Sequence, residues 1–108
     1  MFQINSKPVK KKVVKGYRIY GMSIDRYVSA YNYYDKPRTG VWTKKVDDQF
    51  HAFTGRGEFT HYRKDFPDEK PRLYLVELRG NIQRGRWSAN KKFPTYTADE
   101  MRIIKRVK

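Results

Sequence analysis

The alternation of apolar and polar residues is strongest in RLYLVELRG, residues 72–80. Tyr74, Val76 and Leu78 alternate with the residues between them and leave one face of the segment almost fully apolar. A period of two side chains is typical of a β-strand, because successive residues of a strand point to opposite faces. We therefore predict a strand here that ends at Gly80.

The N-terminal half carries the same signals in a weaker form. Residues 13–20, VVKGYRIY, are mainly β-branched and aromatic, and residues 24–31, IDRYVSAY, alternate with a period of two. With residues 21–23 as the turn, these two segments predict a hairpin. Further short strands are expected over residues 41–46, 50–53 and 101–107.

The remaining segments predict one helix, several loops and a solvated N-terminal arm. A short helix is expected from about Glu58 to Lys64, ahead of Pro67. Residues 7–12, KPVKKK, predict a solvated arm, because Pro8 interrupts regular structure and the lysines repel one another. Loops are expected over residues 32–40, 67–71 and 81–94.

Together these elements predict a small α+β fold in a single domain. It consists of a basic N-terminal arm, residues 1–12, and one domain, residues 13–108, with a mostly antiparallel sheet, one short helix and a C-terminal strand. A length of 108 residues suits one domain, and an aromatic content of 16% makes a compact core feasible.

The amino-acid composition excludes several kinds of catalytic and metal-binding site and indicates where in the cell the protein is expected. The chain has no cysteine, which excludes disulfides, thiolate catalysis and cysteine-ligated zinc. No apolar run approaches the roughly 20 residues of a membrane helix, and the first residues do not resemble a signal peptide. We expect an intracellular protein without membrane association.

The net charge of +14 is concentrated at the two ends of the chain. Residues 1–20 contain six basic and no acidic side chains, and residues 81–108 contain eight basic and two acidic ones. The middle of the chain is nearly neutral. If the ends lie together, their charges form one patch that attracts a polyanion such as nucleic acid or an acidic protein.

Aromatic and basic residues are interleaved along the chain, as in Tyr17-Arg18, Tyr62-Arg63 and Arg86-Trp87. Exposed aromatic rings stack on unpaired bases while arginines hold phosphates, although the same pattern also arises in a sheet with one buried and one wet face. We expect exposure where the ring lies in a predicted loop. The candidate nucleic-acid-binding residues are Lys10, Lys11, Lys12, Tyr33, Tyr34, Arg56, Arg63, Lys64, Arg84, Arg86, Trp87, Lys91 and Lys92.

The two histidines do not predict a metal site. His51 and His61 are ten residues apart, and zinc ligands are commonly two to five residues apart within each pair. We expect His51 to be half-buried and hydrogen-bonded, and His61 to face solvent. The Gly55-Arg56-Gly57 segment lacks the phosphate-loop pattern and is interpreted as a turn before the helix.

The succession KGYRIYG, FHAFTGRGEFTHY, RLYLVELRG and TADEMRIIKR resembles short phage and prophage domains of unknown function, over about residues 16–106. This resemblance implies a small phage-encoded protein in the cytoplasm of a bacterial host. The positive charge also leaves open a role as an inhibitor that binds an acidic host or defence protein.

The same succession is similar to a reduced ADP-ribosyltransferase-like fold. That resemblance implies a role for Arg18 in holding NAD and for Glu100 in acting on the ribose. The chain departs from that family at His51-Ala52-Phe53, where a Ser-Thr-Ser strand belongs, and at Ala98, which replaces the first glutamate of a Glu-x-Glu pair. We therefore expect a binding protein that needs no cofactor, with nucleic acid as the first candidate partner.

Overall fold

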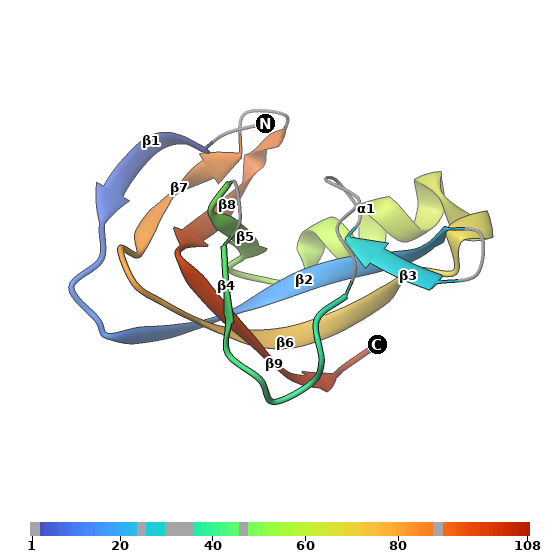
Figure 1. The fold of residues 1–108 in the computed structure, drawn as a ribbon. Coiled ribbons are helices and arrows are strands. Elements are labelled where there is room, and N and C mark those ends of the chain that lie inside the picture. The colour runs from blue at the N-terminus through green and yellow to red at the C-terminus, as the bar shows by residue number, and fades with distance from the viewer. Residues whose placement is uncertain (1–2, 24–25, 30–35, 46–47, 88–89) are drawn as a thin grey trace.

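The computed structural model describes residues 3–23, 26–29, 36–45, 48–87 and 90–108. Within these ranges the chain forms one curled, mostly antiparallel sheet, with a single α-helix lying against its outer side (Figure 1). The expected fold class is therefore confirmed in outline, with more strand than the sequence predicted. The helices of the described residues are too short to cross a membrane.

The strands, in chain order, are β1 (Gln3–Pro8), β2 (Val13–Ser23), β3 (Arg26–Ser29), β4 (Thr43–Lys44), β5 (Phe50–Phe53), β6 (Arg72–Arg79), β7 (Gln83–Trp87), β8 (Asn90–Ala98) and β9 (Glu100–Arg106). The helix α1 spans Gly57–Asp65 and is followed by a 3-10 turn, η1, at Pro67–Glu69. The order across the sheet is β1-β7-β8-β5-β2-β6-β9-β4, and β3 pairs with β2 alone.

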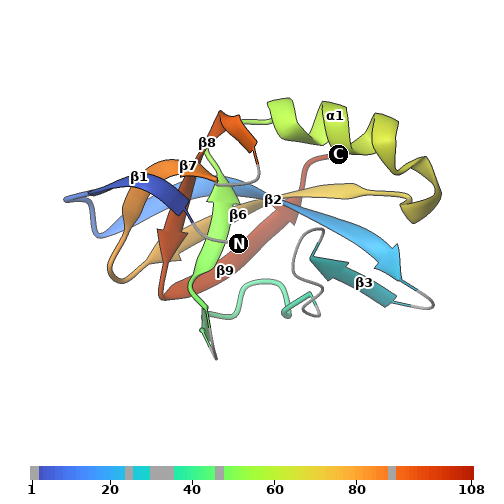
Figure 2. The ribbon, with the colours of Figure 1, turned by 90° about the horizontal axis from the view of Figure 1, so that it is seen from above.

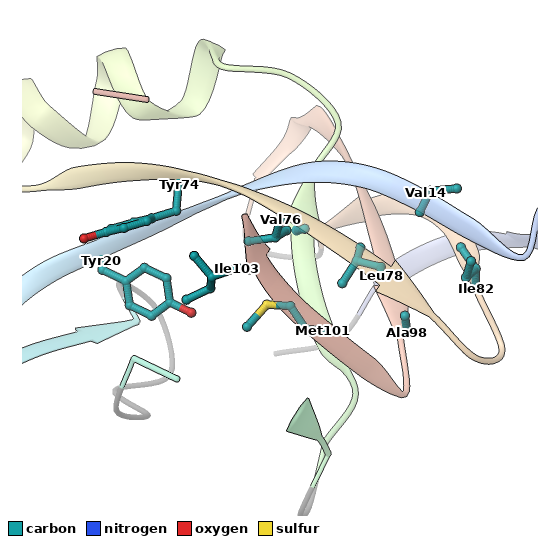
Figure 3. Packing of buried hydrophobic residues seen from close by; sticks show 10 residues of the cluster. Val14, Tyr20, Tyr74, Val76, Leu78, Ile82, Ala98, Met101 and Ile103 are labelled. Atoms are coloured by element: carbon teal, nitrogen blue, oxygen red, sulfur yellow. The ribbon is translucent and has the colours of Figure 1, made fainter. Parts of the chain in front are cut away.

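The inner side of the curled sheet holds the larger core. β2 and β6 pair without interruption from Val13 opposite Arg79 to Tyr20 opposite Arg72, and β9 lies on the far side of β6. Alternate residues of these strands point inward and are fully buried (Figure 3). They include Tyr20, Val76, Leu78, Met101 and Ile103. The apolar face predicted for residues 72–80 is thus confirmed.

A second core lies between the outer side of the sheet and α1. Phe59 and Tyr62 are three residues apart on the helix, so both face the sheet, where they meet Ile19 and Leu73. The helix begins at Gly57 and ends at Asp65, one residue beyond the expected range at each end. The strand predictions for residues 50–53 and 101–107 are also confirmed, whereas residues 21–23 continue β2 instead of forming a turn.

The main error of the sequence prediction lies in residues 81–94. This segment was expected to be a loop, but it contains β7 and the start of β8, which form an antiparallel hairpin. Likewise, Lys7 and Pro8 belong to β1 instead of a solvated arm, because β1 pairs with β7 from Gln3 opposite Trp87 to Pro8 opposite Gln83. β1 and β7 each depend on the other, a partner from the opposite end of the chain that local composition does not reveal.

Side chains fix the position of β1 on the sheet. Gln3 accepts a hydrogen bond from Thr95 Oγ1 at 2.6 Å through its Oε1 and lies within 3.5 Å of Thr97 Oγ1 through its Nε2. A Cβ at Gly85 would overlap the carbonyl oxygen of Ile4, so the close approach of β1 to β7 requires glycine there. Asn5 adopts a left-handed φ of 55° where the register shifts between Ile4 and Lys7.

Candidate nucleic-acid interface

One part of the fold carries basic residues and no acidic ones, and we call it the basic limb: β1, the loop of residues 9–12, β7 and β8. All eleven acidic residues of the chain lie outside residues 3–23 and 80–98, and the basic limb falls entirely within these two segments. Strand pairing places the segments side by side, although they come from opposite ends of the sequence. In Figure 2, seen from above, the three strands of the limb gather at one end of the molecule.

The loop of residues 9–12 presents three consecutive lysines, Lys10, Lys11 and Lys12, all of which are exposed. The loop is held in place by Val9, whose backbone N–H donates to the carbonyl of Ile82 at 2.9 Å. Its lysines therefore lie beside the turn between β6 and β7. Because no carboxylate occurs in this loop or in β1 and β7, the three ammonium groups add their fields.

A row of side chains crosses the limb on the side that continues from the inner core. Lys7 of β1 lies directly opposite Arg84 of β7, and Arg84 lies directly opposite Tyr96 of β8. Directly paired residues point to the same face, and neighbouring strands are about 4.8 Å apart. Lys7 and Arg84 are exposed and Tyr96 is half-buried. The row therefore sets two cations beside one aromatic ring.

The C-terminal basic residues do not join this patch, and the expectation that both charged ends share one surface is wrong for them. The carbonyl of Lys108 accepts a hydrogen bond from the backbone N–H of Leu73 at 2.9 Å. Leu73 is paired with Ile19 of β2, so Lys108 lies at that end of β2. Lys12, by contrast, precedes Val13 at the other end of β2. At about 3.4 Å per residue, the two groups are about 20 Å apart along the strands.

Trp87 is not the exposed stacking residue that its predicted loop suggested. It is only 5% exposed, because β7 turns its side chain toward the outer core, 5.7 Å from Phe53 and 6.1 Å from His51 between ring centroids. Tyr33 and Tyr34, the other two expected stacking residues, lie outside the described residues.

The remaining candidate cations are divided between the helix and the limb. Arg56, Arg63 and Lys64 are exposed on or next to α1. The guanidinium of Arg56 lies 5.1 Å from the ring centre of Tyr17. The helix covers the outer side of the sheet, whereas Lys7 and Arg84 point to the other side. Arg86 is exposed and shares the face of Arg84; the backbone of Lys91 and Lys92 belongs to β8.

The two residues implied by the ADP-ribosyltransferase-like resemblance do not meet. Arg18 is buried and donates from Nη1 to the carbonyl of His51 at 2.5 Å and from Nε to Tyr20 Oη at 3.1 Å. Glu100 lies on β9 and accepts a hydrogen bond from Arg79 at 2.6 Å. Arg79 is opposite Val13, five residues along β2 from Arg18, which is about 17 Å. The two side chains therefore do not form a common pocket.

His51 has an unusual environment for a histidine. It is half-buried on β5, and its Nε2 makes no hydrogen bond with any described residue. Burial, followed by the positive charge of Arg18, lowers the pKa of His51 from 6.5 to about 4. The ring is therefore neutral at physiological pH. His61, as expected, is exposed, and its ring centre lies 5.5 Å from that of Phe93.

Sequence reasoning missed three residues of interest. Lys7 was assigned to a solvated arm and Tyr96 was not singled out, although Thr95 and Thr97 alternate with it in a β-branched pattern. Trp42 contacts two arginines: its ring centre is 3.9 Å from the guanidinium carbon of Arg79 and 4.8 Å from that of Arg102. These contacts join β6 and β9 to the residue that precedes β4, and they have no local sequence signal.

The described part of the chain contains no group of three or more His, Cys, Asp or Glu side chains that could hold a metal ion. Comparison with known proteins adds no identity: the chain matches no protein-family model, no curated protein and no solved structure.

Proposed function

We propose that this protein binds nucleic acid through the basic limb. The observation that supports the proposal is the separation of charge: the limb combines exposed Lys7, Lys10, Lys11, Lys12 and Arg84 with a complete absence of acidic residues. Cations that serve solubility alone are expected to be interspersed with acidic residues. Cations gathered on one surface form the electrostatic footprint of a polyanion-binding site.

The physical mechanism is the release of counterions from the phosphate backbone. Each phosphate that a lysine or arginine neutralises frees bound salt ions, so the logarithm of the binding constant falls linearly with that of the salt concentration. Five contacts to a single strand give a slope of about −3.5, at about 0.7 per contact. Raising the salt from about 50 to 200 mM then weakens binding about 100-fold.

The test is fluorescence anisotropy with labelled DNA and RNA oligonucleotides across a salt series. The variant Lys10→Gln/Lys11→Gln/Lys12→Gln removes three exposed charges from the limb and is expected to reduce the slope by about 2. The matched control, Lys105→Gln/Arg106→Gln/Lys108→Gln, removes three exposed charges at the opposite end of β2. It is expected to leave the slope nearly unchanged.

Two outcomes would contradict the proposal. Absence of binding at the lowest salt would exclude nucleic acid as the partner. An equal loss in both triple variants would show that binding follows net charge without a defined surface. An acidic protein that is captured from nuclease-treated bacterial lysate, when oligonucleotides are not bound, would assign the limb to a protein partner instead.

A further inference from the structure

Tyr96 differs from Lys7 and Arg84, its neighbours in the row across the limb, because it carries an aromatic ring and no positive charge. It is the aromatic member of the row that begins with Lys7 and Arg84, and it is half-buried, packed against the inner core. An aromatic ring that is wet on one side and supported on the other is the form of a stacking platform for a base.

The immediate surroundings of Tyr96 are small. Its directly paired partner on β5 is Ala52, and its same-face neighbours along β8 are Pro94 and Ala98. An ideal Cβ at Gly16 would come no closer than 3.8 Å to the edge of the Tyr96 ring. Its two direct pairing partners are therefore one small residue and Arg84, and the ring packs against the inner core.

We infer that the basic limb takes single-stranded nucleic acid, with a base stacked on Tyr96 and the adjoining phosphates held by Arg84 and Lys7. This inference rests on the proposed function and adds the class of nucleic acid. The bases of a duplex are already stacked on both faces and cannot lie flat on a protein ring, whereas an unpaired base can. A cation one strand away is placed to reach the phosphate of the same nucleotide.

The charged and apolar residues around Tyr96 are arranged as such a site requires. Two cations lie on one side of the ring, across β7 and β1, and the alanines and Pro94 lie around it. A strand bound there keeps its phosphates toward the basic edge and its bases toward the core. Sequence preference is expected to be weak, because every base offers an aromatic face.

The experiment compares three labelled probes with equal numbers of phosphates: oligothymidylate, an abasic strand and a duplex. Wild-type protein is expected to bind oligothymidylate at least about 5-fold more tightly than the abasic strand, the lower end of the effect of losing one base–aromatic stack. Tyr96→Leu is expected to remove that difference while leaving affinity for the abasic strand unchanged. Tyr96→Phe, which keeps the ring, is expected to restore it.

Tyr27→Leu is the matched control, since Tyr27 is a half-buried tyrosine on β3, far from the limb in the sheet order. Equal wild-type affinity for oligothymidylate and the abasic strand would overturn the inference, even if Tyr96→Leu did not fold. Tighter binding of the duplex, or a preserved ratio in Tyr96→Leu, would also overturn it. Failure of the wild type to bind all three probes would instead overturn the proposed function.

Discussion

Lowering the pH from 7 to 5 is expected to destabilise this protein through His51. In the folded state the pKa of His51 is lowered to about 4 by burial and by the charge of Arg18. In the unfolded chain the pKa returns to about 6.5. Between these values the unfolded chain binds a proton that the folded protein does not. The stability is therefore present above about pH 6.5 and is lost as the pH falls toward 4.

The magnitude follows from the two pKa values. At pH 7 His51 is neutral in both states and contributes little. At pH 5 it is protonated in the unfolded chain and neutral in the folded protein, which lowers the free energy of unfolding by about 2 kcal/mol. The pKa values of Glu100 and Asp99 are lowered in the fold, mainly by hydrogen bonds from Arg79 and Gln49 respectively. Their effect begins only at more acidic pH, so His51 dominates this window.

The assay is urea unfolding, followed by circular dichroism at pH 7 and pH 5, of wild type, His51→Phe and His61→Gln. Wild type and His61→Gln are expected to lose about 2 kcal/mol between the two pH values, and His51→Phe much less. Each variant is compared with itself at the two pH values, so any change in the free energy of unfolding caused by the substitution itself cancels. An undiminished loss in His51→Phe would refute the assignment to His51.

Two further predictions concern the fold and its link to binding. Gly85→Ala places a methyl group against the Ile4 carbonyl and 2.8 Å from Gln3 Cγ, so it is expected to displace β1 and speed amide exchange in that strand. Loss of the Lys7 contact is expected to reduce the salt slope by about 0.7. Gly55→Ala, where a Cβ would meet nothing within 4 Å, is the control, and unchanged exchange in Gly85→Ala would contradict the role given to this glycine. Leu78→Ala, at a side chain with 0% exposure, is expected to lower the free energy of unfolding by about 2–5 kcal/mol in the same urea assay; a loss below about 1 kcal/mol would show that the inner core is not closely packed there.

The sequence predicted the elements whose signal is local. The alternation around Val76 was sufficient to predict β6, and the glycine-containing turn before α1 helped to predict the helix. Both elements have side chains that face a core, and such side chains leave a local pattern in the sequence. The alternation of threonines in β8 was a usable signal too, but glycine, asparagine and basic residues between residues 81 and 92 outweighed it.

The candidate interface was less accessible to sequence reasoning. The basic character of residues 7–12 and 81–94 was visible, and the structure brings those segments together. Their pairing depends on the contact of Gln3 with Thr95 and on the lack of a side chain at Gly85, which are tertiary facts. The burial of Trp87 has the same origin, because only the register of β7 decides which face the ring occupies.

The pairing of Lys7 with Arg84 also has a consequence for synthesis of the chain. β1 leaves the ribosome well before β7 and β8, the strands that hold it. Contacts between such distant segments form slowly, since the intervening chain must first be ordered. A nascent chain that lacks β7 and β8 therefore carries the lysines without their geometry, and the interface forms only after these strands have been synthesised.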